Sequence, residues 1–577
     1  MLDARDLPDG QLLSADVCIV GAGAAGISMA LEFAGSGLEV LLLESGGAGH
    51  EKPTQALYEG GVADERQHSP LHRYRERRLG GSTTIWGGRC VPFDDIDFQA
   101  RTWMPHSGWP FGRGELLPYY VRANQLCEAG TFAYGAAESL GSGARPMIGG
   151  FQSTLFSADG IERFSCPTDF GRRYADQLRA ARNICVLLHA NVTALRLDPA
   201  GTRVDGATVR TLTGKSLGVR AGHFVLATGG LETVRLLLAS RDVHRNGIGN
   251  QYDVVGRYYM CHMAGTIGTL TFARPETVWH GYDVSVEGIY CRRRLALTAA
   301  AQQQLQAGNF IARLHHPRIT DPGHRTGLLS LLYLAKAFIP YEYAKRLHDG
   351  QGGGLLQVLA HVGNVLRDPF GTAAFLLHWL RYRTLPRRKF PSIIIKSRAD
   401  RYSLDFHAEQ WPNPASRVTL GSGHDALGMP KLHVDWRYTA GDVVTVQRAV
   451  AALAAELRRC GVGQLDYDPA TVESEMTRYG AYGGHHIGTT RMGGDPRSSV
   501  VDSDCRVHGV DNLFIASSSV FPTSSQANPT LTIIALALRL AAHLKKLDAR
   551  ERSAQFVAPP PTQARERVVR TRDLVHS

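Results

Sequence analysis

The chain has 577 residues, of which 44% are hydrophobic and 20% charged, and its formal net charge is +11. This length is sufficient for two or more hydrophobic cores, because a single core usually stops growing near about 250–300 residues. The basic residues are scattered, and the densest group, residues 381–389, is typical of a solvated loop, with an anionic partner or membrane as the alternative. No motif that reads a nucleic-acid groove is present, so nucleic acid is not an expected partner.

Three features bear on cellular location. The first residues carry Asp3, Asp6 and Asp9, whereas a secretory signal begins with basic residues and an apolar segment. The longest apolar stretches, near residues 328–339 and 372–380, are too short or too interrupted to span a bilayer, so a membrane partner is not expected. The nine cysteines show no close pairing, which favours a reducing compartment. We therefore expect a cytoplasmic protein.

The N-terminal region contains the complete pattern of a nucleotide-binding strand–helix–strand unit. Residues 16–44 read DVCIVGAGAAGISMALEFAGSGLEVLLLE, in which a β-branched strand is followed at once by Gly-x-Gly-x-x-Gly and an amphipathic helix. Two glycines end the helix, and a second apolar strand over residues 38–43 leads to Glu44. The glycine motif alone is weak evidence, but within this complete unit it predicts a bound dinucleotide.

Each glycine of this motif has a physical role. Gly21 permits the tight turn, Gly23 lets the backbone approach a pyrophosphate, and Gly26 lets the helix pack closely on the strand. The helix start offers free N–H groups to the phosphates, and Glu44 can accept hydrogen bonds from the adenosine ribose, which argues against NADP. NAD and FAD share this unit, so it does not choose between them. The predicted contacts are Gly21, Gly23, Ala24, Ala25, Gly26, Glu44 and Ser45.

Later segments extend the predicted cofactor site. Residues 79–89 read LGGSTTIWGGR, whose glycines suit a loop against a flat ring or a diphosphate, with a purely structural loop as the alternative. Two runs, 184–192 and 222–228, have the composition of strands, and the second leads into a helix over residues 231–240, as expected for a return to the nucleotide-binding sheet. The predicted contacts here are Gly80, Gly81, Ser82, Trp86, Gly87, Gly88, Val192, Ala227, Thr228 and Gly229.

The middle of the chain, about 270–475, alternates short strands with helices. Residues 326–389 are rich in Leu, Ala and aromatic residues, and we interpret them as two or three amphipathic helices that cover the substrate entrance with their apolar faces buried. A surface that docks on a membrane or a partner is the alternative. Residues 553–577 are rich in Pro and Arg without periodicity and are predicted to be disordered.

Two polar segments near the C-terminus are candidates for catalysis. Residues 483–493 read GGHHIGTTRMG, and a histidine among glycines can present its imidazole to a ligand cavity. At Asn528-Pro529, proline in the first helical position would hold Asn528 at the start of a helix. Cys505 and His508 lie nearby, but their spacing matches no standard zinc set, so no metal is predicted.

In these motifs and their order, the chain resembles the glucose–methanol–choline (GMC) oxidoreductase family over nearly its whole length. Residues 255–260 (VGRYYM) and 409–418 (EQWPNPASRV) add to the match, and the resemblance is to bacterial sugar-oxidising members of the pyranose oxidase and fructose dehydrogenase types. It implies an α/β fold with a Rossmann-like FAD-binding domain on a parallel sheet and a substrate domain on a largely antiparallel sheet with covering helices. The implied FAD-binding domain comprises residues 1–105, 184–268 and 481–548, and the substrate domain comprises 106–183 and 269–480 with a helical insertion at 326–389.

The resemblance also implies which residues bind FAD and act on the substrate. The family's catalytic histidine stands three residues before the glycine of a Gly-Thr pair, which is His485 here rather than His486, and its partner position is Asn528. Ser518, Asn528, Pro529 and Thr530 are further implied FAD contacts. Related sugar oxidases can attach flavin to a histidine just before the tryptophan of the second glycine segment, and Ile85 occupies that position, so noncovalent FAD is predicted.

Together these features predict oxidation of a CH–OH group of a sugar, aminosugar, cyclitol or glycoside to the carbonyl. We expect neutral His485 to accept the hydroxyl proton while Asn528 hydrogen-bonds the same oxygen and the C–H bond faces flavin N5. A lyase on the same fold that uses His485 without net redox chemistry, and a nicotinamide-dependent reductase, are the alternatives. No haem-attachment motif or cysteine cluster is present, so the expected electron acceptor is oxygen, a quinone or a separate redox partner.

Overall fold

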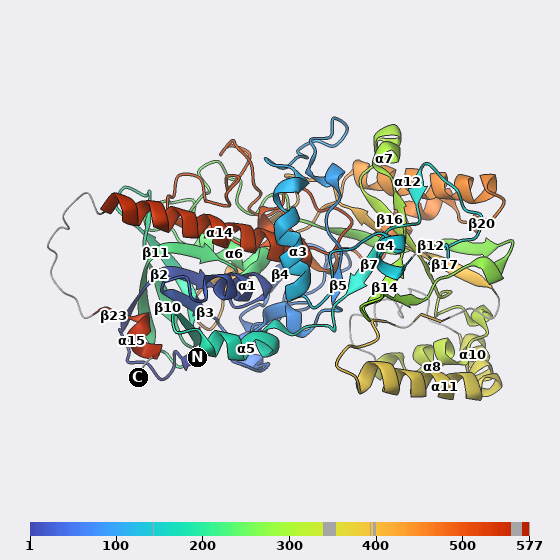
Figure 1. Ribbon diagram of the computed structural model, residues 1–577, viewed down its shortest axis with the longest axis horizontal. Coiled ribbons are helices and arrows are strands. Elements are labelled where there is room, and N and C mark those ends of the chain that lie inside the picture. The colour runs from blue at the N-terminus through green and yellow to red at the C-terminus, as the bar shows by residue number, and fades with distance from the viewer. Residues whose placement is uncertain (142, 339–353, 393, 396–399, 556–567, 576–577) are drawn as a thin grey trace.

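A computed structural model describes residues 1–141, 143–338, 354–392, 394–395, 400–555 and 568–575. The molecule is elongated, with a parallel sheet in one half and an antiparallel sheet in the other (Figure 1). This arrangement confirms the predicted α/β fold class.

The first sheet contains nine strands and carries the nucleotide-binding unit. Its central strands are parallel to one another, and β10 joins antiparallel to β11 on one side and β9 on the other. The main path is β1 (Leu2–Asp3), β8 (Ile184–Leu188), β3 (Val40–Leu43), β2 (Leu12–Val20), β11 (Ser216–Leu226), β10 (Val204–Arg210) and β9 (Asn191–Leu197), with β22 (Leu513–Ile515) on β11 and β23 (Val568–Arg570) on β2.

Helices from distant parts of the chain pack beside this sheet. The first helix, α1 (Ala24–Phe33), packs against the long C-terminal helix α14 (Thr530–Gln555), which also packs against α3 (Leu117–Leu126). Figure 1 shows α14 running along this half of the molecule. The others here are α5 (Phe170–Ala180), which contacts β8, and α6 (Gly229–Ala239), which contacts β9. The short helix α2 (Lys52–Ala56) follows β3 in the chain.

The glycine motif between β2 and α1 is packed too closely for side chains at two of its positions. Gly21 has a φ of 103°, and a Cβ placed on it would lie 2.7 Å from the carbonyl oxygen of Ala227. A Cβ on Gly26 would lie 1.9 Å from the carbonyl oxygen of Gly21. These contacts explain why the turn and the helix–strand packing require glycine.

The second large sheet is antiparallel and contains seven strands. Its strands are β20 (Gly463–Asp466), β12 (Met260–Phe272), β17 (Arg401–Glu409), β16 (Phe310–His315), β15 (Leu295–Leu297) and β6 (Phe156–Ser157), with β21 (Tyr482–Ile487) paired to β12. The predicted domain boundary at residue 268 falls inside β12, and β21 pairs here although its residues were assigned to the FAD-binding domain.

Two smaller sheets and several helices complete the described structure. One sheet contains β13 (Tyr282–Val284), β14 (Tyr290–Arg293), β7 (Ile161–Phe164) and β5 (Arg89–Cys90), and the other contains β18 (Arg417–His424), β19 (Pro430–Asp435) and β4 (Gly60–Val62). The remaining helices outside the insertion include α4 (Ala136–Leu140), α7 (Ala299–Leu305), α12 (Ala440–Arg459), α13 (Val472–Thr477) and α15 (Thr571–Val575).

Residues 184–192 do not form the single strand that their composition predicts. They divide into β8 and the start of β9, which lie in different parts of the same sheet because β8 pairs with β3 and β9 pairs with β10. His189 separates them with a φ of 54°, a left-handed conformation that reverses the chain. An apolar run does not reveal such a turn, because its composition is unchanged across the break.

The C-terminal tail also differs from the prediction of disorder. Residues 553–555 continue α14, and residues 568–575 form β23 and α15. β23 pairs in parallel with Leu12–Ser14 of β2, a part of that strand that extends beyond its pairing with β3. The backbone groups of β2 at this end gain hydrogen-bond partners, which a composition-based prediction cannot anticipate. The rest of the predicted tail lies outside the described residues.

The described part of the insertion at 326–389 is helical as predicted, with residues 339–353 lying outside it, but the apolar faces of its last two helices are not buried. It contains α8 (Gly327–Leu334), α10 (Leu355–Arg367), α11 (Pro369–Trp379) and a π-helical segment, Leu380–Thr384. Large apolar side chains of α10 and α11 are exposed, including Phe370 at 87% and Leu356 at 83%. Within the described residues, no helix combines the length and apolar composition that crossing a bilayer requires.

Candidate active site

A cavity of about 680 Å³ is lined by residues of both large sheets. This volume lies within the range of about 300–1,000 Å³ that is usual for small-molecule sites. Of the residues predicted from the sequence, Gly26 and Gly80 do not line it. Those that do are Gly21, Gly23, Ala24, Ala25, Glu44, Ser45, Gly81, Ser82, Trp86, Gly87, Gly88, Val192, Ala227, Thr228, Gly229, His485, Ser518, Asn528, Pro529 and Thr530.

Helix starts at this cavity have the chemistry that a diphosphate requires. Gly23 precedes α1 and Thr228 precedes α6, and neither helix start is capped by a side chain in the described structure. Free backbone N–H groups and the positive end of the helix dipole attract phosphate oxygens. Apart from the two adjacent residues of the chain, no heavy atom lies within 4 Å of a Cβ placed on Gly23. Open space therefore lies beside the backbone at the point where a ligand must approach. These features fit the diphosphate of FAD.

Glu44 both lines the cavity and stabilises the loop around it. Its carboxylate accepts hydrogen bonds from the backbone N–H groups of Ala22 and Gly46, each at 2.9 Å. Burial raises its pKa, while those two hydrogen bonds and the charge of Arg77 act in the opposite direction. A carboxylate has about four lone-pair sites, so these two contacts leave acceptor capacity for ribose hydroxyls.

The second glycine segment lies directly against the first. A Cβ on Gly81 would lie only 3.0 Å from the Cα of Gly23, so the two segments form adjoining walls of the cavity. Trp86 donates its indole N–H to the carbonyl of Thr168 at 2.9 Å, which holds the loop in place. Gly80 instead faces the start of α5, where a Cβ would lie 2.7 Å from the backbone nitrogen of Gly171.

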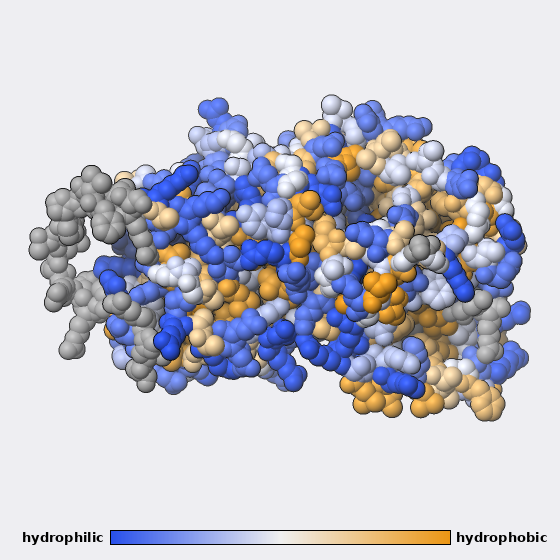
Figure 2. Space-filling view, viewed as in Figure 1, coloured by the Kyte–Doolittle hydropathy of each residue, from blue (hydrophilic) through white to orange (hydrophobic). Residues whose placement is uncertain are grey.

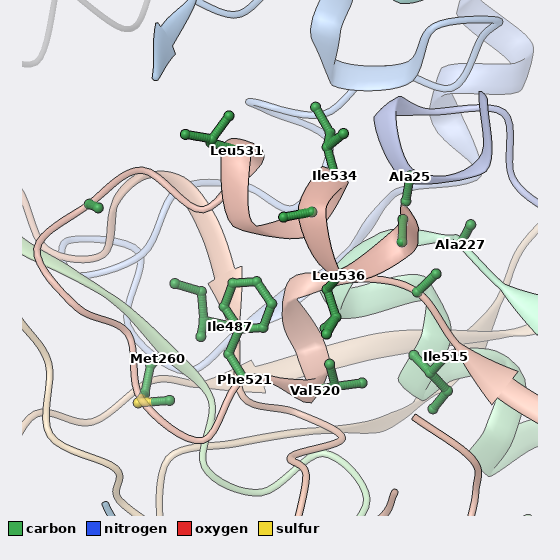
Figure 3. Close-up of a cluster of buried hydrophobic side chains, with 14 of the residues drawn as sticks. Ala25, Ala227, Met260, Ile487, Ile515, Val520, Phe521, Leu531, Ile534 and Leu536 are labelled. Atoms are coloured by element: carbon green, nitrogen blue, oxygen red, sulfur yellow. The ribbon is translucent and has the colours of Figure 1, made fainter. Parts of the chain in front are cut away.

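His485 and Asn528 meet at the cavity although they come from different parts of the fold. His485 is in β21, and Asn528 comes two residues before α14. His485 Nε2 lies 3.1 Å from Asn528 Nδ2, and Asn528 Oδ1 is buried with no hydrogen-bond partner in the described structure. Figure 3 shows the buried cluster that supports both segments, including Ile487 of β21 and Leu531 of α14.

His262, which was not among the residues predicted from the sequence, contacts the ring nitrogen of His485 on the side away from Asn528. It lies in β12, the strand paired with β21, is fully buried, and its Nδ1 is 2.8 Å from Nδ1 of His485. Asn528 donates its amide hydrogen to Nε2, so this ring nitrogen carries a lone pair and the proton of neutral His485 is on Nδ1. His262 can accept that proton and so selects the tautomer in which Nε2 is a base. Its only sequence signal is its position two residues after the family-like VGRYYM stretch.

The surroundings keep these histidines neutral. The pKa of His485 is well below its usual value because the ring is buried, and the nearby His262 and Arg89 lower it further. Burial, followed by the charge of Arg89, lowers the pKa of His262 to about 3. His407 of β17 lies 5.4 Å from His262 between ring centroids, and burial lowers its pKa in the same way. Neutral His485 is therefore available as a proton acceptor at neutral pH.

His486 also lines the cavity but has different partners. Its Nδ1 lies 2.6 Å from the hydroxyl of Tyr259, which is also 2.8 Å from Nε2 of His68. The ring of His486 stacks on those of Tyr259 and His68. Its neighbour His485, by contrast, is the histidine that contacts Asn528.

Arginine side chains line the end of the cavity formed by the antiparallel elements. Arg89 of β5, Arg292 of β14 and Arg313 of β16 line it, with Asp405 of β17 as the acidic residue among them. Arg313 pairs with Asp405 at 3.0 Å, and Arg89 pairs at 2.6 Å with Glu162, which is fully buried. Burial, followed by repulsion from Arg313, lowers the pKa of Arg89 to about 9, while Glu162 opposes this shift. No local sequence pattern marks these residues as a group, because they come from separate strands.

Two family models match the chain. The model described as FAD dependent oxidoreductase matches residues 16–294, and the model described as GMC oxidoreductase matches residues 412–537. The first includes the β2–α1 turn, and the second includes His485 and Asn528.

Several curated proteins are similar over most of their length. The 6'''-hydroxyparomomycin C oxidase of Streptomyces lividus is 25% identical over 92% of this chain and 92% of its own. The fructose dehydrogenase large subunit of Gluconobacter japonicus is 26% identical over 92% of this chain and 98% of its own. The paromamine 6'-oxidase of Streptomyces fradiae is 27% identical over 91% of this chain and 90% of its own.

Solved structures share the fold. Pyridoxine 4-oxidase from Mesorbium loti superposes with a TM-score of 0.54 at 19% identity, covering 92% of this chain and 98% of its own. A fungal aryl-alcohol oxidase superposes with a TM-score of 0.52 at 14% identity, covering 94% of this chain and 100% of its own. These structures show the fold, and the two matched regions show an FAD-dependent oxidoreductase whose C-terminal part is of the GMC oxidoreductase type.

Proposed function

We propose that this enzyme oxidises a CH–OH group of a small polyhydroxylated molecule to the carbonyl, with His485 as the general base. The observation that carries this proposal is the 3.1 Å contact between His485 Nε2 and Asn528 Nδ2 on the cavity wall. Both groups can reach one hydroxyl oxygen placed beside them. Bound FAD supplies a two-electron acceptor for the hydride.

The roles of the two side chains follow from their chemistry. When the substrate hydroxyl takes the place of the Asn528 amide at Nε2, His485 accepts the hydroxyl proton there as the C–H hydrogen leaves with its electron pair, so no free alkoxide has to form in water. Asn528 donates a hydrogen bond to the same oxygen, which becomes more negative in the transition state. His262 is a positioning residue, because it acts on the substrate only through His485.

The substrate class is supported by the cavity and by the relatives. Arginine donors suit a molecule with many hydroxyl oxygens, and three relatives are named for oxidising fructose, paromamine and hydroxyparomomycin C. At the end of the cavity formed by the antiparallel elements, Arg89, Arg292 and Arg313 outnumber Asp405 and the buried Glu162. This excess of positive charge favours neutral sugars, cyclitols and glycosides over aminosugars. Those relatives are oxidases or a dehydrogenase, so they lend no support to a lyase.

The test is anaerobic reduction of the bound flavin by a panel of sugars and polyols, followed by turnover with a redox dye with and without oxygen. We expect His485→Ala to slow flavin reduction by about 10²–10⁴-fold and Asn528→Ala by about 10²–10³-fold. His508→Ala is the matched control, because His508 bonds to Ser499 and does not line the cavity. An unchanged rate in His485→Ala would remove this residue from the mechanism. The dye and oxygen arms distinguish an oxidase from an enzyme that uses a quinone or a redox partner.

We also propose that FAD is bound without a covalent link. Ile85, at the position before Trp86, lines the cavity and offers no nucleophilic atom. Acid precipitation of the yellow protein should therefore leave a colourless pellet and release all flavin to the supernatant. A pellet that keeps its flavin absorbance would contradict this prediction.

A further inference from the structure

The helix α10 is amphipathic, but its polar side faces the protein. His361 is buried and contacts the Ser330 hydroxyl of α8 at 3.0 Å, and buried Asn364 donates to the carbonyl of Pro322 at 2.8 Å. The apolar side points outward, with Leu356 83% and Leu366 74% exposed. A helix of a water-exposed surface normally has the opposite orientation, so water is a poor partner for this face.

The exposed apolar surface continues along α11 and the segment after it. Phe370 is 87% exposed, Leu377 67% and Leu385 74%, while Thr372 is the buried residue of α11. Figure 2 shows apolar side chains gathered along the lower right edge of the molecule, where Figure 1 draws α10 and α11. Contiguous apolar patches on a soluble protein usually mark a binding surface.

The charges around this surface indicate what binds there. Residues 354–390 contain six Lys and Arg residues and one acidic residue, Asp368. Asp368 is buried and accepts a hydrogen bond from the backbone of Gly327, so it does not offset the surface charge. Arg381 and Lys389, both beyond the end of α11, are exposed. Two copies joined through this face would bring like charges together, whereas an anionic surface would complement them.

We propose that α10, α11 and the basic segment 381–389 form a docking face for an anionic lipid bilayer. The apolar side chains enter the boundary between headgroups and acyl chains, and the basic side chains contact the lipid phosphates. Trp379, the last residue of α11, and Tyr382, in the π-helical segment after it, have the amphipathic rings that favour this interface. At 13 and 11 residues the helices lie on the bilayer, because crossing its apolar core takes about 20 residues.

The docking face adjoins the cavity. Arg383, Pro391 and Ser392, which follow α11, line the cavity wall. A docked enzyme therefore holds this wall next to the membrane, where a lipid-soluble electron acceptor or a lipid-linked sugar would be found. The docking itself does not depend on the proposed function.

The experiment is co-sedimentation of the full-length holoenzyme with vesicles of phosphatidylcholine alone and of phosphatidylcholine with phosphatidylglycerol. We expect binding to the anionic vesicles that weakens as NaCl is raised. The triple variant Leu356→Ser/Phe370→Ser/Leu377→Ser should bind at least about tenfold more weakly. The pair Arg381→Gln/Lys389→Gln should bind about 20-fold more weakly at low salt.

The matched control is Tyr252→Ser/Val284→Ser/Val286→Ser, which removes apolar side chains that are 53%, 55% and 80% exposed outside the insertion. It should bind vesicles like the wild type. Retained flavin absorbance in every variant shows that the fold is intact, so weaker binding reports on the surface. Wild-type protein that stays in the supernatant with both vesicle types would overturn the proposal. The proposal would also be overturned if sedimentation velocity showed a dimeric wild-type protein and a monomeric triple variant, while neither protein bound vesicles.

Discussion

The protonation of His485 is determined by groups that the sequence places far away from it. Asn528 occupies its Nε2 and His262 its Nδ1, so the ring has one defined tautomer before any substrate arrives. Burial and the neighbouring positive groups disfavour the imidazolium form. These contacts keep the imidazole neutral over a wide pH range, as the proposed role of general base requires.

The pH dependence of the wild-type enzyme follows from this. Because the pKa of His485 is lowered, the neutral base form persists below the ordinary value of about 6.5 and is lost only at more acidic pH. We expect the acid limb of a plot of kcat/KM against pH to lie well below 6.5, with activity falling as pH decreases through it. Rates of flavin reduction measured from pH 4 upward would check this. An acid limb at or above about 6.5 would contradict it.

His262 should affect the reaction through His485. We expect His262→Ala to lower kcat by up to about 10²-fold, because a base displaced by about 1 Å loses much of its effect. The acid limb should move as well, since the loss of the Nδ1 contact changes the tautomer and pKa of His485. His262→Asn, which restores a polar group at this site, should recover part of the rate. A merely structural role would leave the pH profile of both variants unchanged.

At the scale of elements, the β2–α1 turn performs two separable tasks. Gly21 and Gly26 allow the chain to pack against itself, whereas the space beside Gly23 is open toward the cavity. The first task concerns folding and the second concerns the cofactor.

Substitutions at two of these glycines should therefore have different effects. Gly26→Ala should lower the free energy of unfolding by about 1–3 kcal/mol, because its Cβ would overlap the carbonyl oxygen of Gly21. Gly23→Ala should leave the thermal stability of the flavin-free protein nearly unchanged but weaken FAD binding. Thermal melts of the apoprotein and flavin titrations would measure the two effects. Equal stability loss in both variants would refute the division of roles.

The helices of the insertion show that the spacing of apolar residues predicts a helix but not its orientation against the protein. The apolar spacing in residues 326–389 predicts helices, and helices form there. It does not indicate which side faces the protein, because a helix with two distinct sides can be packed with either side inward. Hydrogen bonds from His361 and Asn364 turn the polar side of α10 inward, and this depends on Ser330 and Pro322 being close by.

At the scale of the whole molecule, the arginine-rich end of the cavity is assembled from five strands of two sheets. Arg89, Arg292 and Arg313 surround Asp405 and the buried Glu162 close to His407. The segments that contribute them span residues 89–405 of the chain. Only the packing of the small sheet on the antiparallel sheet brings their charges to one end of the cavity.

This arginine-rich end of the cavity should determine which sugars are oxidised. We expect neutral sugars to have a kcat/KM at least about tenfold higher than matched aminosugars at neutral pH, because a protonated amine is repelled by the guanidinium groups. Arg89→Gln should narrow that difference while the bound flavin is retained. Steady-state kinetics on matched sugar and aminosugar pairs would test this, and a preference for the aminosugar would refute it.

The sequence alone predicted the nucleotide-binding unit, the family resemblance and the pair of His485 and Asn528, whose side chains the structure brings together. Each of these depends on short local patterns: glycines at turns, an acidic residue after a strand, and a proline that starts a helix. Such patterns can be recognised in the sequence because the backbone conformations that they specify depend on only a few neighbouring residues.

The tertiary structure alone decided the support of His485 by His262, the arginine-rich end of the cavity, the pairing of β23 and the outward apolar face of α10. In each case the partner is remote in the chain, as with His262 and His485 or Leu12–Ser14 and Val568–Arg570. Burial, hydrogen-bond partners and net local charge depend on which remote segments pack together. Those quantities set the pKa of the base and the polarity of a surface, and no local pattern specifies them.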